Sequence, residues 1–231
     1  FRESLGIRAP EGLPAFPRFE EQLAVAVEEG VPVFSFTFGA LDAGTVGRLR
    51  ERGTFVMGTA TTPREALELE RAGVDAVVAQ GVEAGGHRGS FGGPPESGLI
   101  GTLALVPQVA DRVRLPVVAA GGIMDGRGLA AALALGASAV QMGTAFLATP
   151  ESGASPAYKE AVLAPADEDR TALTRAFTGR LARGVRNRFM VEVERAGAIL
   201  PYPEQGALSQ DIRQAAARGK RAELLSLWAG Q

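Results

Sequence analysis

One ten-residue stretch, Gln80 to Gly89, carries most of the side chains in this chain that could do chemistry. It reads Gln-Gly-Val-Glu-Ala-Gly-Gly-His-Arg-Gly and contains His87, the single histidine among 231 residues. Histidine normally titrates near neutral pH, so His87 is a candidate general base or a hydrogen-bond donor to an anionic substrate. A structural histidine usually lies among apolar neighbours. His87 lies between Gly-Gly and Arg-Gly, which favours a functional role.

Two glutamines, Gln80 and Gln141, stand at predicted strand ends where apolar residues are usual. Each amide either satisfies loop backbone or hydrogen-bonds a heteroaromatic ring, because an amide offers both a donor and an acceptor. Gly85-Gly86 has the same two interpretations. It forms either a plain turn or a backbone that lies flat against a ring system.

Two further pairs, Gly121-Gly122 and Gly143-Thr144, follow neighbouring predicted strands. Each could be only a tight turn, but together they form a cradle of backbone N–H groups and one hydroxyl that suits a phosphate. Arg88 either pairs with Glu83 or contacts an anion. A set of five arginines is predicted to be a solvated helical face, with phosphate binding as the alternative. These are Arg175, Arg180, Arg183, Arg186 and Arg188.

Composition excludes several kinds of site. The chain has no cysteine, which excludes disulfides, thiolate nucleophiles and cysteine-ligated metals. One histidine cannot make a multi-histidine zinc site, so no metal is predicted. The 24 basic and 26 acidic residues give a net charge of -2, which predicts no nucleic-acid or membrane partner. Without a long apolar run or a signal peptide, we expect a cytoplasmic protein.

Apolar runs alternate with helix-like segments along residues 19–142. Five strands are predicted: Val31–Phe38, Thr54–Ala60, Val74–Gln80, Leu115–Ala120 and Ala139–Met142. The helices between them carry recognisable ends, since Asp42 and Asp125 suit N-caps, and Thr62-Pro63 with Glu65 suits a capping box. After about residue 150 the chain is predicted to be mostly helix and loop, and to end in a helix over Arg218–Trp228.

This alternation predicts an α/β fold with a parallel sheet covered by helices. Five strands suit either an open doubly wound sheet or most of an eight-stranded barrel. The two glycine-containing pairs favour the barrel, because the loops after barrel strands seven and eight commonly bind phosphate. The chain has no Gly-x-Gly-x-x-Gly segment that opens a helix. It has no internal repeat or linker, which predicts a single domain over residues 1–231.

The residues at 80–89 resemble the signature of the nitronate monooxygenases, formerly called 2-nitropropane dioxygenases. Four further segments agree with this family, so the resemblance spans nearly the whole chain. They are Val33-Phe-Ser-Phe-Thr-Phe-Gly39, Ala119-Ala-Gly-Gly-Ile123, Gln141-Met-Gly-Thr-Ala-Phe146 and Pro201-Tyr-Pro203.

The resemblance implies an FMN-dependent (β/α)8 TIM barrel. It implies contacts to FMN from Gln80, Gly85, Gly122, Gln141, Met142, Gly143 and Thr144. Gly121 is added from its position, and His87 would be the active-site histidine beside the flavin N5 edge. The implied reaction is oxidation of an anionic alkyl nitronate by O2 to a carbonyl compound and nitrite. His87 would orient the nitro group and would take the α-proton of a neutral nitroalkane. A homo-oligomer is one arrangement that the sequence leaves open.

The family carries three barrel strands that the printed chain does not contain. We therefore expect the five strands to be barrel strands four to eight, so that the FMN-binding barrel domain is incomplete at its N-terminus. Five strands cannot close such a barrel by themselves.

Two other functions compete with nitronate oxidation. One is an NAD(P)H-using reductase on the same barrel, either a quinone reductase or the related FMN-dependent enoyl-ACP reductase, which shares Glu-Ala-Gly-Gly-His. Gln80 and Arg88 fit the nitronate enzymes better. The other is a non-catalytic flavin or phosphate binder, which an incomplete barrel could be.

Overall fold

The computed structural model describes residues 1–14, 16–164 and 170–231, which divide into two compact units. The sheet unit consists of Phe16–Ala84 and Arg88–Met142. The hairpin unit consists of Phe1–Ala15, Gly85–His87 and Gly143–Gln231. Each unit is described by itself below, and the organisation of the chain as a single domain stays a prediction.

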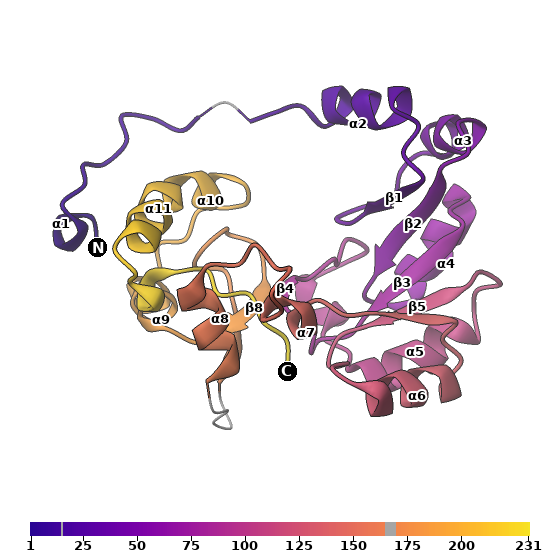
Figure 1. Ribbon diagram of the computed structural model, residues 1–231. Coiled ribbons are helices and arrows are strands. Elements are labelled where there is room, and N and C mark those ends of the chain that lie inside the picture. The colour runs from indigo at the N-terminus through magenta and orange to yellow at the C-terminus, as the bar shows by residue number, and fades with distance from the viewer. Residues whose placement is uncertain (15, 165–169) are drawn as a thin grey trace. The chain divides into compact units, whose positions relative to one another are not determined.

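The sheet unit contains a parallel sheet of five strands, paired in the order β1-β2-β3-β5-β6 (Figure 1). The strands are β1 (Val33–Phe36), β2 (Phe55–Ala60), β3 (Ala76–Gln80), β5 (Val117–Ala120) and β6 (Ala139–Gln141). They are the five strands predicted from the sequence, with starts up to two residues later. The predicted α/β class is therefore confirmed, and the carboxyl ends of all five strands lie at one edge of the sheet.

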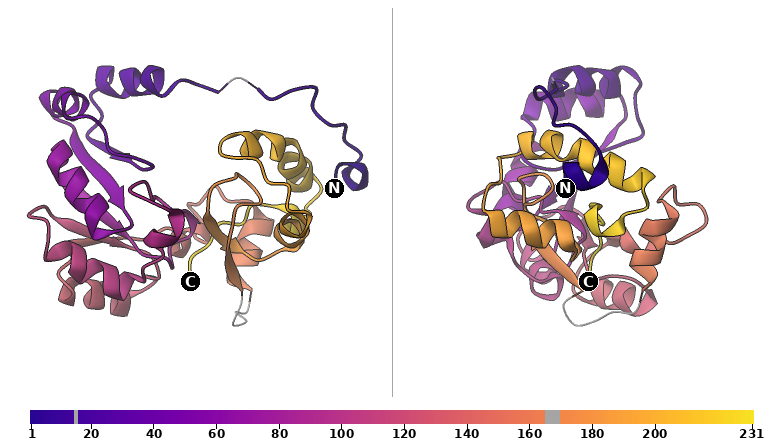
Figure 2. Two further views of the ribbon diagram at one scale, coloured as in Figure 1. Left: turned by 180° about the vertical axis from the view of Figure 1, so that it is seen from behind. Right: turned by 90° about the vertical axis from the view of Figure 1, so that its left-hand side faces the viewer.

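The first α-helix of the sheet unit precedes β1, and the other four connect successive strands of the sheet. These α-helices are α2 (Phe19–Glu28), α3 (Ala43–Glu51), α4 (Pro63–Ala72), α5 (Thr102–Ala110) and α6 (Gly126–Ala134). The last four lie along one face of the sheet (Figures 1 and 2). The predicted caps are confirmed, because Asp42 accepts from the Thr45 N–H at 2.9 Å and Asp125 accepts from the Arg127 N–H at 3.0 Å.

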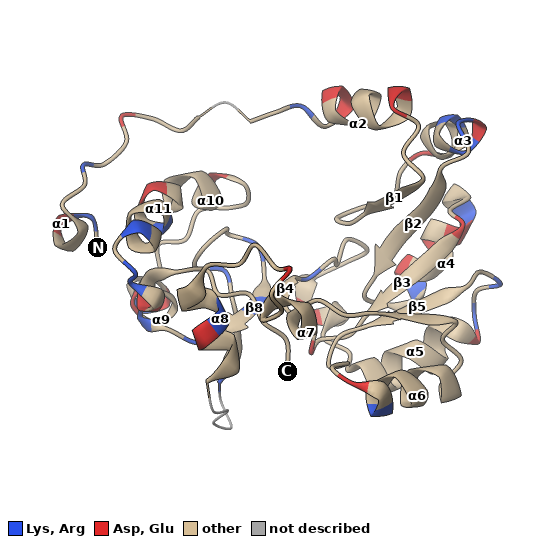
Figure 3. Cartoon of the chain, viewed as in Figure 1, with Lys and Arg blue, Asp and Glu red and all other residues tan. Residues whose placement is uncertain are grey.

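The core of the sheet unit lies between the sheet and these helices. Val77 and Ala79 of β3 are fully buried against Leu69 of α4 and Leu105 of α5. Burying such apolar side chains is the main stabilising contribution to the fold, at about 1.5–3 kcal/mol for each large one. Charged residues of both signs occur along α3 and α4, whereas α5 carries none (Figure 3).

The loop after β3 is anchored by a buried carboxylate. Glu65, 1% exposed, completes the predicted capping box with Thr62 at the start of α4. The same carboxylate also accepts from the N–H groups of Thr61 at 2.6 Å, Phe91 at 2.6 Å and Gly92 at 2.8 Å. A residue predicted as a helix cap therefore also holds the glycine-rich segment that follows the histidine motif.

The hairpin unit is built around antiparallel strands. The order β4-β8-β7 joins β4 (Gly86–His87), β8 (Ala182–Val185) and β7 (Thr171–Thr174). Its α-helices are α1 (Arg2–Leu5), α7 (Thr144–Leu147), α8 (Pro156–Leu163), α9 (Arg188–Ala196), α10 (Glu204–Leu208) and α11 (Gln210–Arg218). The 3-10 helix η2 (Ala222–Leu224) packs against α8, α9 and α11, and the other 3-10 helix, η1 (Pro95–Gly98), belongs to the sheet unit.

The prediction that the chain after residue 150 is mostly helix and loop is confirmed for the described residues, in which the short strands β7 and β8 are the addition. Strands β7 and β8 have only four residues each, and the pairing of β8 with β4 joins segments far apart in sequence. The predicted helix over Arg218–Trp228 is wrong, because α11 ends at Arg218 and the 3-10 helix η2 follows. The five arginines do not form one helical face, since Arg183 lies in β8 and is 7% exposed.

We expect Glu65→Gln to lower the free energy of unfolding by about 3 kcal/mol, because an amide NH2 would face buried N–H donors. Urea unfolding followed by circular dichroism measures this change. Glu68→Gln, an exposed carboxylate on the same helix, is the matched control and should change stability by less than about 0.5 kcal/mol. Equal effects of the two substitutions would show that Glu65 does not anchor the loop.

Candidate functional site

The carboxyl end of the parallel sheet brings together the sequence-predicted residues of the sheet unit. The strand register pairs Gln80 with Ala120 and Ala120 with Gln141, so these three residues form one row across β3, β5 and β6. Residues in one row of a parallel sheet point to the same face, so both glutamines lie on one face of the sheet. The role of both glutamines in holding FMN stays a prediction.

The side chain of Gln80 has a backbone partner. Its Oε1 accepts a hydrogen bond from the Gly89 N–H at 2.9 Å, which is the loop-satisfying role considered from the sequence. Gln141 is exposed on the edge strand β6, followed by half-buried Met142.

Gly121 and Gly122 both have positive φ angles, 115° and 68°, which explains the glycines that end β5. A Cβ on Gly121 would lie 2.9 Å from the Ala84 nitrogen and 3.0 Å from Thr102 Oγ1. Gly121 is therefore required by close packing of the chain on itself.

Glu83 and Arg88 both bind neighbouring loop and helix backbone. The Glu83 carboxylate accepts from the Thr102 N–H at 2.9 Å and lies 2.8 Å from its hydroxyl, so it caps α5. Arg88, 1% exposed, donates to the carbonyls of Gly81 at 2.5 Å and Gln80 at 2.8 Å, and also to that of Gly98 at 2.8 Å. These contacts favour a structural role for Arg88 over the contact to a bound anion considered from the sequence.

His87 lies in the hairpin unit, where β4 pairs it with Ala182 of β8. Its Nε2 is 2.8 Å from the hydroxyl oxygen of Thr178, in the loop between β7 and β8. Two aromatic rings flank the imidazole, that of Tyr202 at 6.0 Å in an edge-on arrangement and that of Trp228 at 5.5 Å, between ring centroids. His87 is thus half-buried beside two aromatic rings and a hydroxyl group.

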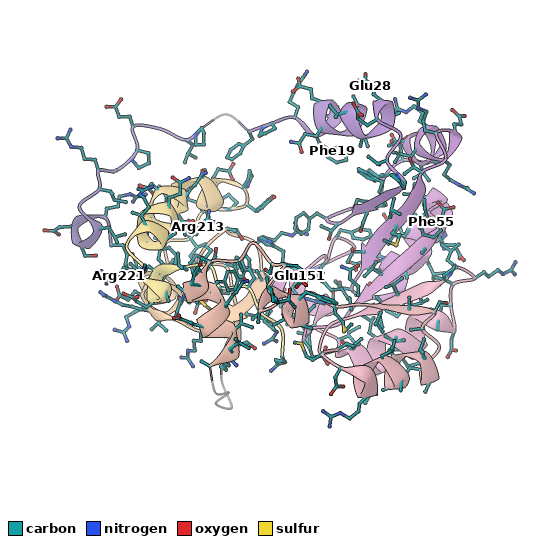
Figure 4. All side chains as sticks on the ribbon, viewed as in Figure 1. Phe19, Glu28, Phe55, Glu151, Arg213 and Arg221 are labelled. Carbon is teal, nitrogen blue, oxygen red and sulfur yellow. The ribbon has the colours of Figure 1, made fainter. Side chains whose placement is uncertain are left out.

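The surroundings of His87 keep it neutral. Burial, and then the positive charges of Arg180 and Arg213, lower the pKa of His87 from its ordinary 6.5 to about 4. Arg213 lies on α11 (Figure 4), where its guanidinium donates to Ser209 Oγ at 3.3 Å and to the Gly206 carbonyl at 3.0 Å. The same positive potential that disfavours an imidazolium attracts an anion.

The remaining predicted residues, Gly85, Gly143 and Thr144, also lie in the hairpin unit. A Cβ on Gly85 would lie 2.6 Å from the Gly230 nitrogen, so this glycine allows the chain near Ala229 to pass. Gly143 precedes α7, and a Cβ there would meet no heavy atom within 4 Å. The Thr144 hydroxyl oxygen accepts from the Gly230 N–H at 2.9 Å, which leaves its hydrogen to donate.

Sequence reasoning missed Thr178, Arg180, Arg213 and Trp228 as neighbours of His87. They are far from His87 in the sequence, and Arg180 had been noted only as one of the five arginines. Tyr202 had been noted only as part of a Pro-Tyr-Pro segment. In the described ranges of the chain, no group of three or more metal-ligating side chains could hold a metal ion, and no helix is long and apolar enough to cross a membrane.

Comparison with known families gives one consistent result. A family model described as nitronate monooxygenase matches residues 2–231. A curated relative from Staphylococcus aureus (strain JH9), named "Probable nitronate monooxygenase", is 47% identical over 216 residues, which are 93% of this chain and 61% of the relative. The chain therefore spans about three fifths of the length of this relative.

Solved structures agree with that match. The chain is similar to nitroalkane oxidase from Streptomyces ansochromogenes, with a TM-score of 0.91 and 48% identity over 100% of this chain and 67% of that one. It is also similar to FabK from Thermotoga maritima, with a TM-score of 0.76 and 38% identity over 94% of this chain and 66% of that one. These neighbours have TIM-barrel-like folds, to which the parallel sheet described above conforms.

We expect the imidazole of His87 to titrate with a pKa of about 4. Because the chain has one histidine, a single ring is followed by NMR as the pH is varied. The matched variant Arg213→Gln should raise this pKa only in part, since burial is the larger cause. A wild-type pKa near 6.5 would contradict the described surroundings of His87.

The same shift predicts a pH dependence of stability. The unfolded chain binds a proton at His87 below its ordinary pKa of 6.5, while the folded chain does so only below about 4. Stability is therefore lost as the pH falls from 6.5 through 4, by on the order of 3 kcal/mol from this group. Urea unfolding at both ends of this range should show less of this loss in His87→Gln than in wild type, and equal losses would contradict the assignment.

Proposed function

We propose that this chain, which belongs to the nitronate monooxygenase family, binds FMN and oxidises alkyl nitronates with O2 to carbonyl compounds and nitrite. The family membership gives the class of enzyme, a flavin-dependent oxidoreductase. The substrate class, the identity of the flavin as FMN and the use of O2 are the proposal.

The observation that carries the proposal is the electrostatic setting of His87. The imidazole is neutral at physiological pH, and the charges of Arg180 and Arg213 reach it. An alkyl nitronate is already deprotonated and anionic, so it gains from this positive potential and needs no strong base to activate it.

The residues assigned to FMN fit an anionic cofactor with a heteroaromatic ring. None is acidic, and they offer the side-chain amides of Gln80 and Gln141, the hydroxyl of Thr144 and backbone N–H groups. The position where Gly143 would carry a Cβ is open, which suits a close approach of backbone to a phosphate. Gly85 and Gly121 fit less directly, because close packing of the chain on itself already accounts for both.

In this proposal Gln80, Gly85, Gly121, Gly122, Gln141, Met142, Gly143 and Thr144 hold FMN. FMN, when bound, supplies the electron acceptor for the nitronate and the centre that passes electrons to O2. His87 orients the nitro group and, when the substrate is a neutral nitroalkane, takes its α-proton. The rings of Tyr202 and Trp228 lie beside the imidazole.

The second candidate is NAD(P)H-dependent reduction on the same fold. It is favoured by the segment Glu83-Ala84-Gly85-Gly86-His87, which the FMN-dependent enoyl-ACP reductases share. These residues indicate a flavin site more specifically than they indicate a substrate. The two candidate functions therefore differ in the electron donor, which is a nitronate in one and NAD(P)H in the other.

We expect His87→Ala to lower nitronate turnover by about a hundredfold or more, since general acid–base or orienting groups contribute on this scale. Nitrite release and O2 consumption measure the turnover, and the flavin absorbance of the purified protein measures retained FMN, which should be unchanged. Gln108→Ala, an exposed amide on α5, is the control and should change neither quantity.

Three other results would reject parts of this assignment. Unchanged turnover in His87→Ala would remove His87 from the reaction. NAD(P)H oxidation without nitronate turnover in wild type would favour the reductase. Bound FMN without either reaction would indicate a non-catalytic flavin binder.

A further inference from the structure

Thr178 hydrogen-bonds the His87 ring, and several contacts fix the position of its loop. The loop joins β7 to β8, and Thr178 is 9% exposed. Two buried side chains bind the carbonyls just before it. Gln205 Nε2 donates to Ala176 O and Ser209 Oγ donates to Phe177 O, both at 2.7 Å.

The turn after Thr178 is equally restricted. Gly179 has a φ of 81°, and a Cβ there would lie 2.5 Å from the carbonyl carbon of Pro201. No other residue type fits at this point without displacing the Pro201 backbone. The Thr178 hydroxyl is therefore presented to His87 by a loop that has little freedom to move.

The hydroxyl of Thr178 has two neighbours and one hydrogen. Its oxygen lies 2.8 Å from His87 Nε2 and 3.3 Å from the Arg180 carbonyl oxygen. A carbonyl oxygen only accepts, so the hydroxyl hydrogen must point to Arg180 if both contacts are hydrogen bonds. The hydroxyl oxygen then accepts from His87, which requires the hydrogen of the neutral imidazole to be on Nε2.

We propose that Thr178 is a positioning residue that holds neutral His87 as its Nε2–H tautomer and so makes Nδ1 the nitrogen that exchanges a proton. This role rests on the proposed function of His87. The motif at residues 80–89 contains His87 but does not predict a role for Thr178, which lies outside it.

The proposal refines what His87 does. In this tautomer Nδ1 carries a lone pair, which suits removal of the α-proton of a neutral nitroalkane. A hydrogen bond from Nδ1 to an anionic nitronate would need the protonated ring, which burial and the charges of Arg180 and Arg213 disfavour. The tautomer set by Thr178 therefore matters for the neutral nitroalkane, and the two arginines attract the anionic nitronate. The charges that lower the pKa of the ring are those of Arg180 and Arg213, and both are positive.

The test is a ring-nitrogen NMR spectrum of the FMN-loaded protein labelled with 15N-histidine. With one histidine in the chain, the two ring nitrogens are read without assignment variants. Above pH 6 we expect hydrogen on Nε2 in wild type and in Thr178→Ser, and a mixture of tautomers in Thr178→Val. Thr171→Val, in the same hairpin and with its hydroxyl on Arg183, is the control and should match wild type.

Steady-state kinetics complete the test. Turnover of neutral nitroalkane in Thr178→Val should fall by about tenfold or more in kcat, with rescue by Thr178→Ser and with FMN content unchanged. Hydrogen on Nδ1 in wild type, or an unchanged tautomer in Thr178→Val, would overturn the proposal. If wild type shows the Nε2–H tautomer but no nitronate or nitroalkane turnover, the proposed function fails while the assignment of Thr178 as the residue that sets the tautomer stands.

Discussion

The pairing of the two-residue strand β4 with β8 is the constraint on which the candidate site depends. His87 belongs to a glycine-rich segment, and this pairing fixes its backbone opposite Ala182. Without the pairing, the chain's only imidazole would lie in a long loop between β3 and α5 and would have no defined orientation. Within the sheet unit, buried Arg88 binds the carbonyls of Gly81 and Gly98, and buried Glu65 binds the N–H groups of Phe91 and Gly92.

The chemistry of the imidazole follows from what surrounds it once it is fixed. Burial and two guanidinium groups make the charged form unfavourable, so the ring is a neutral group in a positive potential. Such a setting suits a substrate that arrives as an anion. In our proposal the Thr178 hydroxyl sets the tautomer of the imidazole. Because it donates to the Arg180 carbonyl, it accepts from Nε2–H of His87.

Local signals in the sequence predicted the sheet unit well. Five apolar runs gave five strands, and Asp42, Thr62 with Glu65, and Asp125 capped the helices expected of them. These features depend on neighbours within a few residues, so pattern and propensity find them. The second role of Glu65, on the N–H groups of Phe91 and Gly92, depends on a contact across 26 residues and had no signal.

The hairpin unit could not be predicted in the same way. β7 and β8 are short and contain arginine or threonine where apolar residues are usual, so their strand character comes from pairing with each other and, for β8, also with distant β4. The partners of His87 are distant as well, with Thr178 separated from it by 91 residues. The sequence predicted only part of the role of the glycines. Gly85 and Gly121 lack a side chain because neighbouring parts of the chain pack closely against them.

The central claim is that a nitronate is the electron donor at a flavin served by His87. It is tested most directly by the visible spectrum of the FMN-loaded protein, recorded without O2 as an alkyl nitronate is added and, in parallel, as NAD(P)H is added. The account predicts that the nitronate changes the flavin band and that NAD(P)H leaves it unchanged. Bleaching by NAD(P)H, with a flavin band that the nitronate does not alter, would contradict it.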